Sequence, residues 1–224
     1  MKFIKGWLGE MKTNFYLWFS LPKKTYHRYH NLILPSKNGT TQIDHLIISV
    51  YGVFIVETKN KKGWIFGSEN QDNWTQTIYG KNYSFQNPLK QTFRQKAVLS
   101  EFLNLTLSKI HTVVYFVGDC SFKTEMPENV INYDVGRFIK QFQNILLSTE
   151  IVDQIVSTIE KQVSHSSLST RDHIKSLHIR HSSNTICPKC GSNLVEKTAT
   201  KGFNPGVKFL GCENYPKCKF TKDM

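Results

Sequence analysis

Hydrophobic residues in the N-terminal half of the chain recur with two different spacings, and each spacing predicts a different element. Residues 1–20 place bulky apolar side chains mostly three or four positions apart, which is typical of an amphipathic helix. Leu21-Pro22 ends this helix, because the residue before proline is disfavoured in helical conformation. Runs rich in β-branched residues then predict four strands, and Tyr51-Gly52 between the two longest indicates a hairpin. The expected strands are residues 29–35, 41–50, 53–60 and 63–67, the last as a third strand of the hairpin.

The rest of the chain continues as a mixture of helices and strands. Residues 82–88 are rich in polar and turn residues and are expected to form a loop, and Pro88 opens a helix to about Leu107. A buried strand at 110–118 and one or two helices between 134 and 163 follow. This order predicts an α/β fold. The segment of residues 164–173 is polar and rich in serine, which predicts a linker. The expected domains are therefore residues 1–163 and 185–224, with a linker at 164–184.

Composition and charge narrow the class of protein. The 224 residues are 39% hydrophobic and 12% aromatic, which suits one ordinary domain with a small appendage and excludes a disordered chain. The net charge of +12 favours a nucleic acid or an anionic membrane surface as partner. The apolar runs are too short to span a membrane and the start has no signal-peptide core, so we expect a cytoplasmic protein whose partner is nucleic acid and not a membrane.

The predicted hairpin brings three charged residues together. Side chains of a strand alternate between its faces, so Glu57 and Lys59 lie on one face with Val53 and Ile55. A two-residue loop allows two registers: with Val50-Tyr51 at the turn, Asp44 opposes Glu57, and with Tyr51-Gly52 it opposes Lys59. Both registers put Asp44 on the same face, whereas a three-residue loop would do so only with a bulge.

Two carboxylates and an ammonium on a largely apolar face have two interpretations. Asp44 and Glu57, with the Thr58 carbonyl and waters, could hold Mg²⁺ or Mn²⁺, because these cations prefer oxygen ligands. Lys59 could then orient the attacking water or stabilise charge on a phosphate. The alternative is a structural ion pair at the end of a strand, followed by a solvated basic turn.

The ordered set of motifs around these residues resembles the nuclease-related domain, NERD, of the PD-(D/E)xK restriction-endonuclease-like superfamily. The resemblance covers about residues 9–102 and more loosely the chain to 163, and its motifs are "GWLGE", "TQIDHLIIS", "YGVFIVETKN", "GWIFG" and "FQNPLKQ". It implies a restriction-endonuclease-like mixed sheet flanked by helices, and hydrolysis of DNA. The residues that match the family's site are Glu10, Asp44, Glu57, Lys59 and Gln91. The middle residue of the E-x-K pair is Thr58 where the family has Val or Ile, and its side chain should point to the other face.

Several of these side chains also have ordinary structural interpretations. Glu10 could be a solvated helix residue and Gln91 an N-terminal helix residue. His45 is expected to pack on the face opposite Asp44. Trp64 and Trp74 are expected to pack within the domain, although either could stack on bases.

Four cysteines near the C-terminus predict a metal site. Cys187 and Cys190 form one close pair and Cys212 and Cys218 another, with 21 residues between the pairs, a pattern that suits tetrahedral Zn²⁺ in a closed structural site. Residues 185–222 resemble the C4 zinc ribbon of bacterial type IA DNA topoisomerases, which implies binding of single-stranded DNA. The side chains expected to contact DNA are Lys189, Lys208, Tyr215, Lys217, Lys219 and Phe220.

Together these features predict a metal-dependent deoxyribonuclease that uses Mg²⁺ or Mn²⁺, with a zinc ribbon that binds DNA. Two alternatives stay open. The nuclease-like domain could be a non-catalytic scaffold of a nucleic-acid-binding protein, or the substrate could be RNA.

Overall fold

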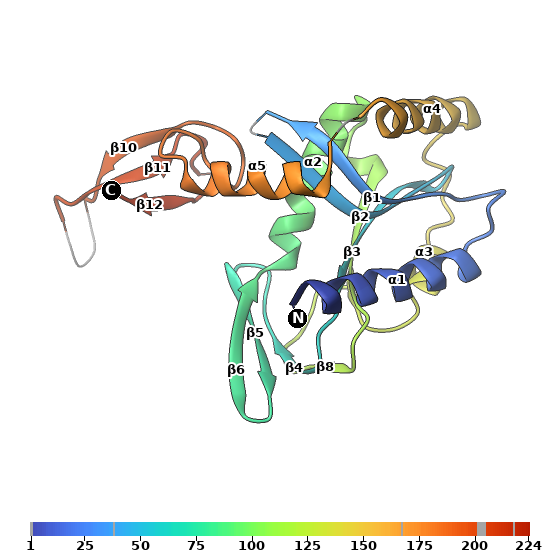
Figure 1. The fold of residues 1–224 in the computed structure, drawn as a ribbon, viewed down its shortest axis with the longest axis horizontal. Coiled ribbons are helices and arrows are strands. Elements are labelled where there is room, and N and C mark those ends of the chain that lie inside the picture. Colours follow the sequence, from blue (N-terminus) through green and yellow to red (C-terminus); the bar gives the residue numbers. More distant parts are fainter. Residues whose placement is uncertain (1, 38, 167, 201–204, 217) are drawn as a thin grey trace. The chain divides into compact units, whose positions relative to one another are not determined.

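The structure is a computed structural model that describes residues 2–37, 39–166, 168–200, 205–216 and 218–224, and the side chains from Gly9 onward within these ranges. The chain divides into two compact units, drawn in Figure 1. The first comprises residues 1–34 and 42–166, and the second comprises residues 35–41 and 167–224.

The first unit is built on a five-stranded mixed sheet. Its strand order is β1-β2-β3-β7-β9, in which β2 and β3 are antiparallel while β3, β7 and β9 are parallel neighbours. The strands are β1 (His27–Ser36), β2 (Gly39–Ser49), β3 (Gly52–Lys59), β7 (Ile110–Phe116) and β9 (Val130–Ile131). The central strand β3 is apolar from Val53 to Val56, as a strand covered on both faces must be.

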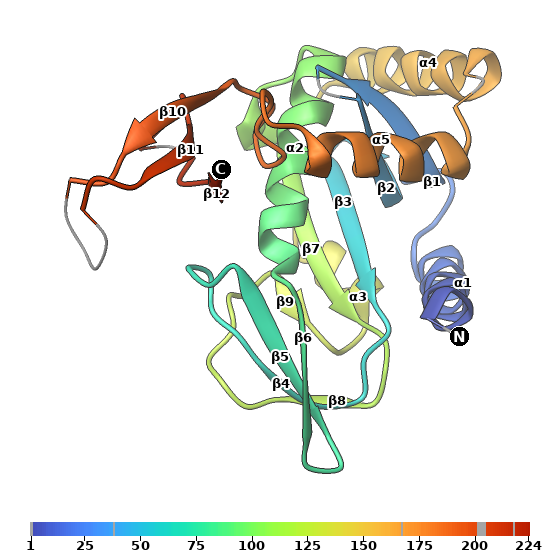
Figure 2. The ribbon, with the colours of Figure 1, turned by 60° about the vertical axis from the view of Figure 1, so that its left-hand side comes forward.

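Helices cover both faces of this sheet. Leu99 of α2 (Pro88–Leu103) and Ile155 of α4 (Thr149–His165) pack with Ile55 on one face. Leu17 of α1 (Lys2–Ser20) and Phe138 of α3 (Val135–Ile139) pack with Phe54 on the other. Figure 2 shows α2 lying along β3 and β7. The alternation of β3 therefore separates two cores, and the face that carries Glu57 is the face covered by α2.

A second, four-stranded sheet has the order β6-β5-β4-β8. Its strands are β4 (Gly63–Phe66), β5 (Asn73–Ile78), β6 (Lys81–Gln86) and β8 (Cys120–Phe122). Its buried face is built around Trp74, whose ring stacks on Phe116 with centroids 6.2 Å apart. Gly67 makes room for this ring, since a Cβ at that position would lie 2.2 Å from it. The short 3₁₀ helix η1 (Leu107–Lys109) leads into β7.

The second unit contains a helix and a small sheet. The sheet has the order β10-β11-β12, formed by β10 (Leu194–Thr198), β11 (Lys208–Cys212) and β12 (Thr221–Asp223). Helix α5 (Thr170–Ser182) ends where Lys222 of β12 donates to the carbonyls of Ser182 and Ser183, at 3.2 and 3.1 Å. The β1–β2 tip also belongs to this unit, because Thr40 bonds to His173 and Ser176 of α5.

Three local expectations were wrong. The segment 164–184 is not an unstructured linker, since α4 runs to His165 and α5 occupies 170–182 behind a capping box of Ser169 and Asp172. Residues 81–86 form β6 and not a loop, and residues 63–66 belong to the second sheet and not to the main hairpin.

One of the two tryptophans expected to pack within the domain lies differently. Trp74 is buried as expected, but Trp64 is 52% exposed. On α1, Phe15 and Trp18 face solvent, and Leu17 packs against the sheet.

The fold class agrees with the sequence: the described residues form a mixed α/β arrangement with a small C-terminal sheet around four cysteines. No helix among the described residues is long and apolar enough to cross a membrane.

The packing of α2 on the main sheet can be tested with two residues of the same helix. Leu99 is fully buried, whereas Phe93 is 71% exposed. Leu99→Ala should lower the free energy of unfolding of the first unit by about 2–5 kcal/mol, because it removes buried methyl groups and leaves a cavity. Phe93→Ala should change it by less than about 0.5 kcal/mol. Urea titrations followed by circular dichroism measure both, and equal losses would contradict this packing.

Candidate functional site

The β2–β3 hairpin has the register that places Asp44 opposite Glu57. Ser49 pairs with Gly52 and His45 with Val56, so Val50-Tyr51 form a two-residue loop. The Asp44 carboxylate accepts a hydrogen bond from the backbone N–H of Thr58, with Oδ2 and N 2.9 Å apart.

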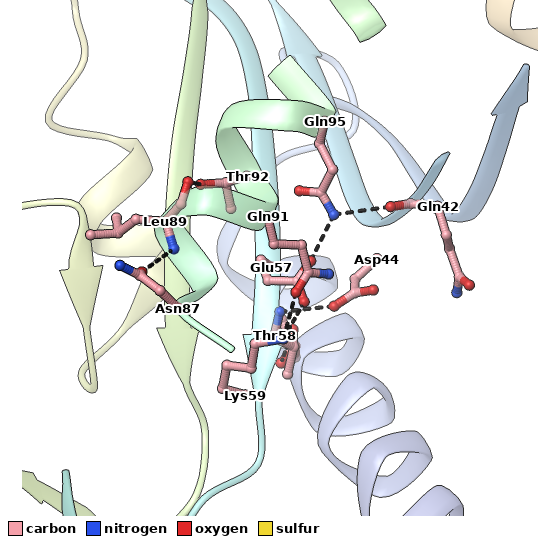
Figure 3. Close-up of polar contacts among 11 residues, drawn as sticks. Gln42, Asp44, Glu57, Thr58, Lys59, Asn87, Leu89, Gln91, Thr92 and Gln95 are labelled. Atoms are coloured by element: carbon pink, nitrogen blue, oxygen red, sulfur yellow. Dashed lines mark hydrogen bonds and ion pairs between the residues drawn. The ribbon is translucent and has the colours of Figure 1, made fainter. Parts of the chain in front are cut away.

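Glu57 and Lys59 meet on the face of the sheet covered by α2, as Figure 3 shows. Lys59 Nζ lies 2.5 Å from Glu57 Oε1 and 3.0 Å from the side-chain oxygen of Gln91. The Glu57 side chain is only 3% exposed and that of Lys59 20%. The helix residue Gln91 therefore lies in the group that the sequence predicted, through its bond to the Lys59 ammonium.

Gln95 is a further member of this group that the sequence analysis missed. Its amide nitrogen donates to Glu57 Oε2 at 2.7 Å and to the Gln42 carbonyl at 2.9 Å. Two acceptors on the nitrogen fix which way the amide faces, so Gln95 holds the second oxygen of Glu57. The signal was available, because Gln91 and Gln95 are four apart on a helix and thus share a face.

Helix α1 approaches the same strand end from the other face. Gly9 is buried, and a Cβ there would lie 2.7 Å from Cβ of Asn60, so glycine permits the close approach of helix and strand. Thr58 points to this face, as the sequence predicted, and its hydroxyl donates to Thr13 at 3.2 Å. Glu10, the residue after Gly9, is thereby brought near the charged group.

Electrostatic interactions tie these residues together. Burial, and then the Glu57 charge, raise the pKa of Asp44 well above its ordinary value, and the same two causes raise the pKa of Glu10. Burial alone would lower the pKa of Lys59, but the surrounding carboxylates, Glu57 first, outweigh it and raise that pKa. Three acidic side chains thus surround one ammonium, which leaves negative charge that only a further cation or proton can neutralise.

This donor set fits a hard divalent cation. Asp44 and Glu57 could supply carboxylate oxygens from neighbouring strands, and the ammonium of Lys59 at Glu57 shows that a cation is favoured there. Among the described residues, however, the carboxylates do not form a group of three convergent ligands. Glu10 therefore acts on this pair through its charge.

The four predicted cysteines do converge. Their sulfur atoms lie within 4.8 Å of one another, with Sγ atoms 3.7 Å apart for Cys187 and Cys218 and 3.3 Å for Cys190 and Cys212. These thiols are not joined by disulfides. Zn–S bonds of about 2.3 Å in a tetrahedron place sulfurs about 3.8 Å apart, so the spacing fits Zn²⁺.

Two tight turns aim these sulfurs. In the first, the N–H of Gly191 donates to the Cys187 carbonyl at 2.9 Å, and Gly191 adopts φ 82°, which glycine accepts readily. In the second turn, the N–H of Cys218 donates to the backbone carbonyl of Asn214 at 2.9 Å. The longer spacing of the second pair accommodates this turn.

The residues of the ribbon that are predicted to contact DNA differ in their exposure and in their ion pairing. Tyr215 is 63% exposed, whereas Phe220 packs partly against the cysteines. Lys189 and Lys219 are exposed, and Lys189 lies 5.9 Å above the Phe220 ring. Lys208 is paired with Glu196 at 2.6 Å, so its charge is partly neutralised. Lys217 lies outside the described residues.

Comparison with known families identifies two domains in the chain. Residues 5–117 match the model of the nuclease-related domain, NERD, and this match spans half of the chain. The chain belongs to the NERD family. Residues 184–224 match the topoisomerase DNA-binding C4 zinc finger.

Individual proteins are also similar to parts of this chain. An uncharacterized protein of Bacillus anthracis is 35% identical over 164 residues, which cover 70% of this chain and 77% of that protein. DNA topoisomerase 1 of Methanocaldococcus jannaschii is 49% identical over 39 residues, or 17% of this chain and 4% of the enzyme. DNA topoisomerase 1 of Helicobacter pylori is 38% identical over 52 residues, 23% and 6% respectively. No solved structure matches the chain.

The raised pKa of the buried Asp44 carboxyl predicts how the stability of the protein depends on pH. Because Asp44 binds its proton more tightly in the folded chain than in the unfolded chain, stability should fall as pH rises from the ordinary pKa of 3.8 toward the raised pKa. Asp44→Asn keeps an acceptor for Thr58 and removes the charge. In metal-free buffer it should therefore stabilise the protein at neutral pH, with no gain near pH 3. Urea unfolding across this range provides the check, and a destabilised variant at pH 7 would contradict the account.

The zinc prediction can be tested by comparing a cysteine of the cluster with Cys120, which lies outside it. The purified protein should contain one Zn²⁺ per chain by elemental analysis, and Cys212→Ser should lower this content and unfold the ribbon. Cys120→Ser should retain full zinc, because Cys120 packs in the first unit. Loss of zinc from both variants, or from neither, would contradict a four-cysteine site.

Proposed function

We propose that this protein is a metal-dependent nuclease that hydrolyses phosphodiester bonds of DNA. The observation that carries the proposal is the meeting of Asp44, Glu57 and Lys59 at one end of a buried strand, in a chain of the nuclease-related family. A structural ion pair needs one acid and one base. It does not explain why a second carboxylate, that of Asp44, is buried close to Glu57, where burial and the Glu57 charge oppose its ionisation.

Each residue of the group has a role in this proposal. Asp44, Glu57 and the Thr58 carbonyl hold Mg²⁺ or Mn²⁺, and Gln95 keeps Glu57 oriented toward the ion. A bound divalent cation lowers the pKa of a coordinated water and polarises a phosphoryl oxygen. Lys59 stays charged at neutral pH, because the carboxylates raise its pKa, and its ammonium stabilises negative charge on the phosphate during attack. Gln91 positions that ammonium, and Glu10 adds negative charge that favours the cation.

We also propose that the zinc ribbon binds single-stranded DNA. Its similarity to DNA topoisomerase 1 supports this role, as do the exposed Tyr215, Lys189 and Lys219. Phe220, Lys208 and Lys217 complete the proposed contacts, with Lys208 the weaker because of Glu196. Four cysteines that are not joined by disulfides suit a reducing compartment, and we infer a cytoplasmic location.

A cleavage assay tests the nuclease directly. Labelled single-stranded, duplex and branched DNA, and an RNA of the same sequence, are incubated with protein and Mg²⁺ or Mn²⁺. Asp44→Asn, Glu57→Gln and Lys59→Met should each reduce cleavage by roughly 10²-fold or more, because each removes a charge that acts on the phosphate or its metal. Asp153→Asn, an exposed acid on α4, should leave the rate unchanged.

The outcomes separate the alternatives. Equal rates for wild type and Asp44→Asn on every substrate would show that cleavage does not come from this site. Binding without cleavage would favour a non-catalytic nucleic-acid-binding protein. Cleavage confined to RNA would make the protein a ribonuclease with the same site.

The salt dependence of DNA binding tests the ribbon. Affinity for a short oligodeoxythymidine is measured by fluorescence anisotropy at several salt concentrations. Lys219→Gln should lower the slope of log affinity against log salt by about 0.7, the value for one phosphate contact on a single strand. Lys208→Gln should change it less, because Lys208 is paired with Glu196. An unchanged slope in both variants would place the phosphate contacts elsewhere.

A further inference from the structure

The second sheet has one face turned to solvent, and nothing in the nuclease group accounts for its residues. The pairing of Trp64 with Thr77 and with Ser121 defines this face, which we call the outer face. Its members by strand alternation are Trp64, Phe66, Asn73, Thr75, Thr77, Asn82, Ser84, Gln86 and Ser121, and Lys123 directly after β8.

Burial distinguishes the two faces clearly. On the inner face, Ile65 and Trp74 are fully buried and Gln76 is nearly so. On the outer face, Trp64 is 52% exposed, and each other member is exposed or partly exposed. A tryptophan so exposed, in a strand whose next residue is fully buried, is available to contact a partner.

Aromatic and basic side chains occur together on this sheet. The Lys123 ammonium lies 5.0 Å above the Trp64 ring, and the Lys61 ammonium lies 4.3 Å above the Phe85 ring at the inner side. The outer-face positions of the described strands include no acidic residue, and the nearest one along the chain, Asp72, directly precedes β5 and is paired with Lys90. Hydroxyl and amide groups, such as the bonded pair Thr77 and Asn82, fill the rest. This chemistry fits an anionic partner with flat rings.

The second sheet is also connected directly to the site formed by Asp44, Glu57 and Lys59, which we call the catalytic group. Strand β4 begins four residues after Lys59, and Gln76 of β5 donates to the Lys62 carbonyl at 2.7 Å, which holds the connection in place. At the other end, β6 leads directly into α2, which carries Gln91 and Gln95. Asn87 at this junction donates to three carbonyls of the β4–β5 loop, Ser68, Glu69 and Gln71. Both halves of the catalytic group thus continue into the second sheet.

We propose that the outer face binds single-stranded nucleic acid, with a base stacked on Trp64 and phosphates contacted by Lys123, and guides the strand to Asp44 and Glu57. A base would take the place of the Lys123 ammonium over the ring, and this exposed ammonium would move to a phosphate. Bases within a duplex are stacked on one another and cannot reach the ring, so the face selects unpaired strands. This inference rests on the proposed function and assigns strand selection to the nuclease domain as well as to the ribbon.

Photo-cross-linking locates the contact. The full, zinc-loaded Asp44→Asn protein is irradiated with oligodeoxynucleotides that carry 5-iodouracil, and cross-linked peptides are identified by mass spectrometry. We expect a cross-link at Trp64 in addition to any in the ribbon. Cross-links confined to the ribbon would overturn the proposal.

Kinetics provide the second readout. Trp64→Ala should raise KM for single-stranded DNA about fivefold or more with little change in kcat, since base stacking on an aromatic ring contributes to binding. Trp64→Phe should recover part of the loss. Tyr133→Ala, whose side chain is 49% exposed outside this sheet, serves as control and should behave as wild type. An unchanged KM for Trp64→Ala would contradict the proposal.

The two proposals fail in different ways. If the protein cleaves DNA in a manner that depends on Asp44 but Trp64 variants are normal and not cross-linked, only the outer-face proposal fails. If Trp64 is cross-linked but no substrate is cleaved, the outer face binds nucleic acid and the nuclease proposal fails.

Discussion

The buried Glu57 carboxylate is the contact on which the candidate site of the first unit depends. A charge at the end of a covered strand costs stability unless its oxygens are bonded, and here Lys59 bonds one oxygen while Gln95 bonds the other. These bonds, together with the packing of Leu99 on Ile55, hold α2 over β3. On the opposite face, Gly9 lets α1 approach the same strand end and brings Glu10 near it. Two helices from distant parts of the sequence are thus positioned around one acidic side chain.

The same arrangement concentrates negative charge instead of dispersing it. Asp44, Glu57 and Glu10 are gathered around a single ammonium, and burial makes Asp44 and Glu10 harder to ionise than in water. A fold optimised for stability would replace Asp44 by a neutral residue. The charge of Asp44 is understandable if a cation binds there, as the proposed metal-dependent nuclease would require.

Part of this site follows from sequence, because strand alternation and a two-residue loop suffice to bring Asp44, Glu57 and Lys59 to one face. The sequence places Gln95 on the same helix face as Gln91, but its bond to Glu57 depends on where α2 crosses the sheet. Strand β6 was missed because it is exposed along most of its length and carries little apolar alternation. Helix α5 was missed because its apolar positions are few, although Ser169 and Asp172 give a capping signal. Its packing with the β1–β2 tip joins segments more than a hundred residues apart, as in the bond from Thr40 to Ser176, and local pattern carries no information on that.

We infer that Asp44 and Glu57 form a site for a divalent cation. The most direct test is a calorimetric titration of Mg²⁺ or Mn²⁺ into protein that holds zinc in the ribbon and no metal at Asp44 and Glu57. Mg²⁺ or Mn²⁺ should bind the wild-type chain at one site, and Glu57→Gln and Asp44→Asn should each abolish that binding while zinc content stays at one per chain. Binding that is absent from the wild type, or unchanged in both variants, would contradict the account.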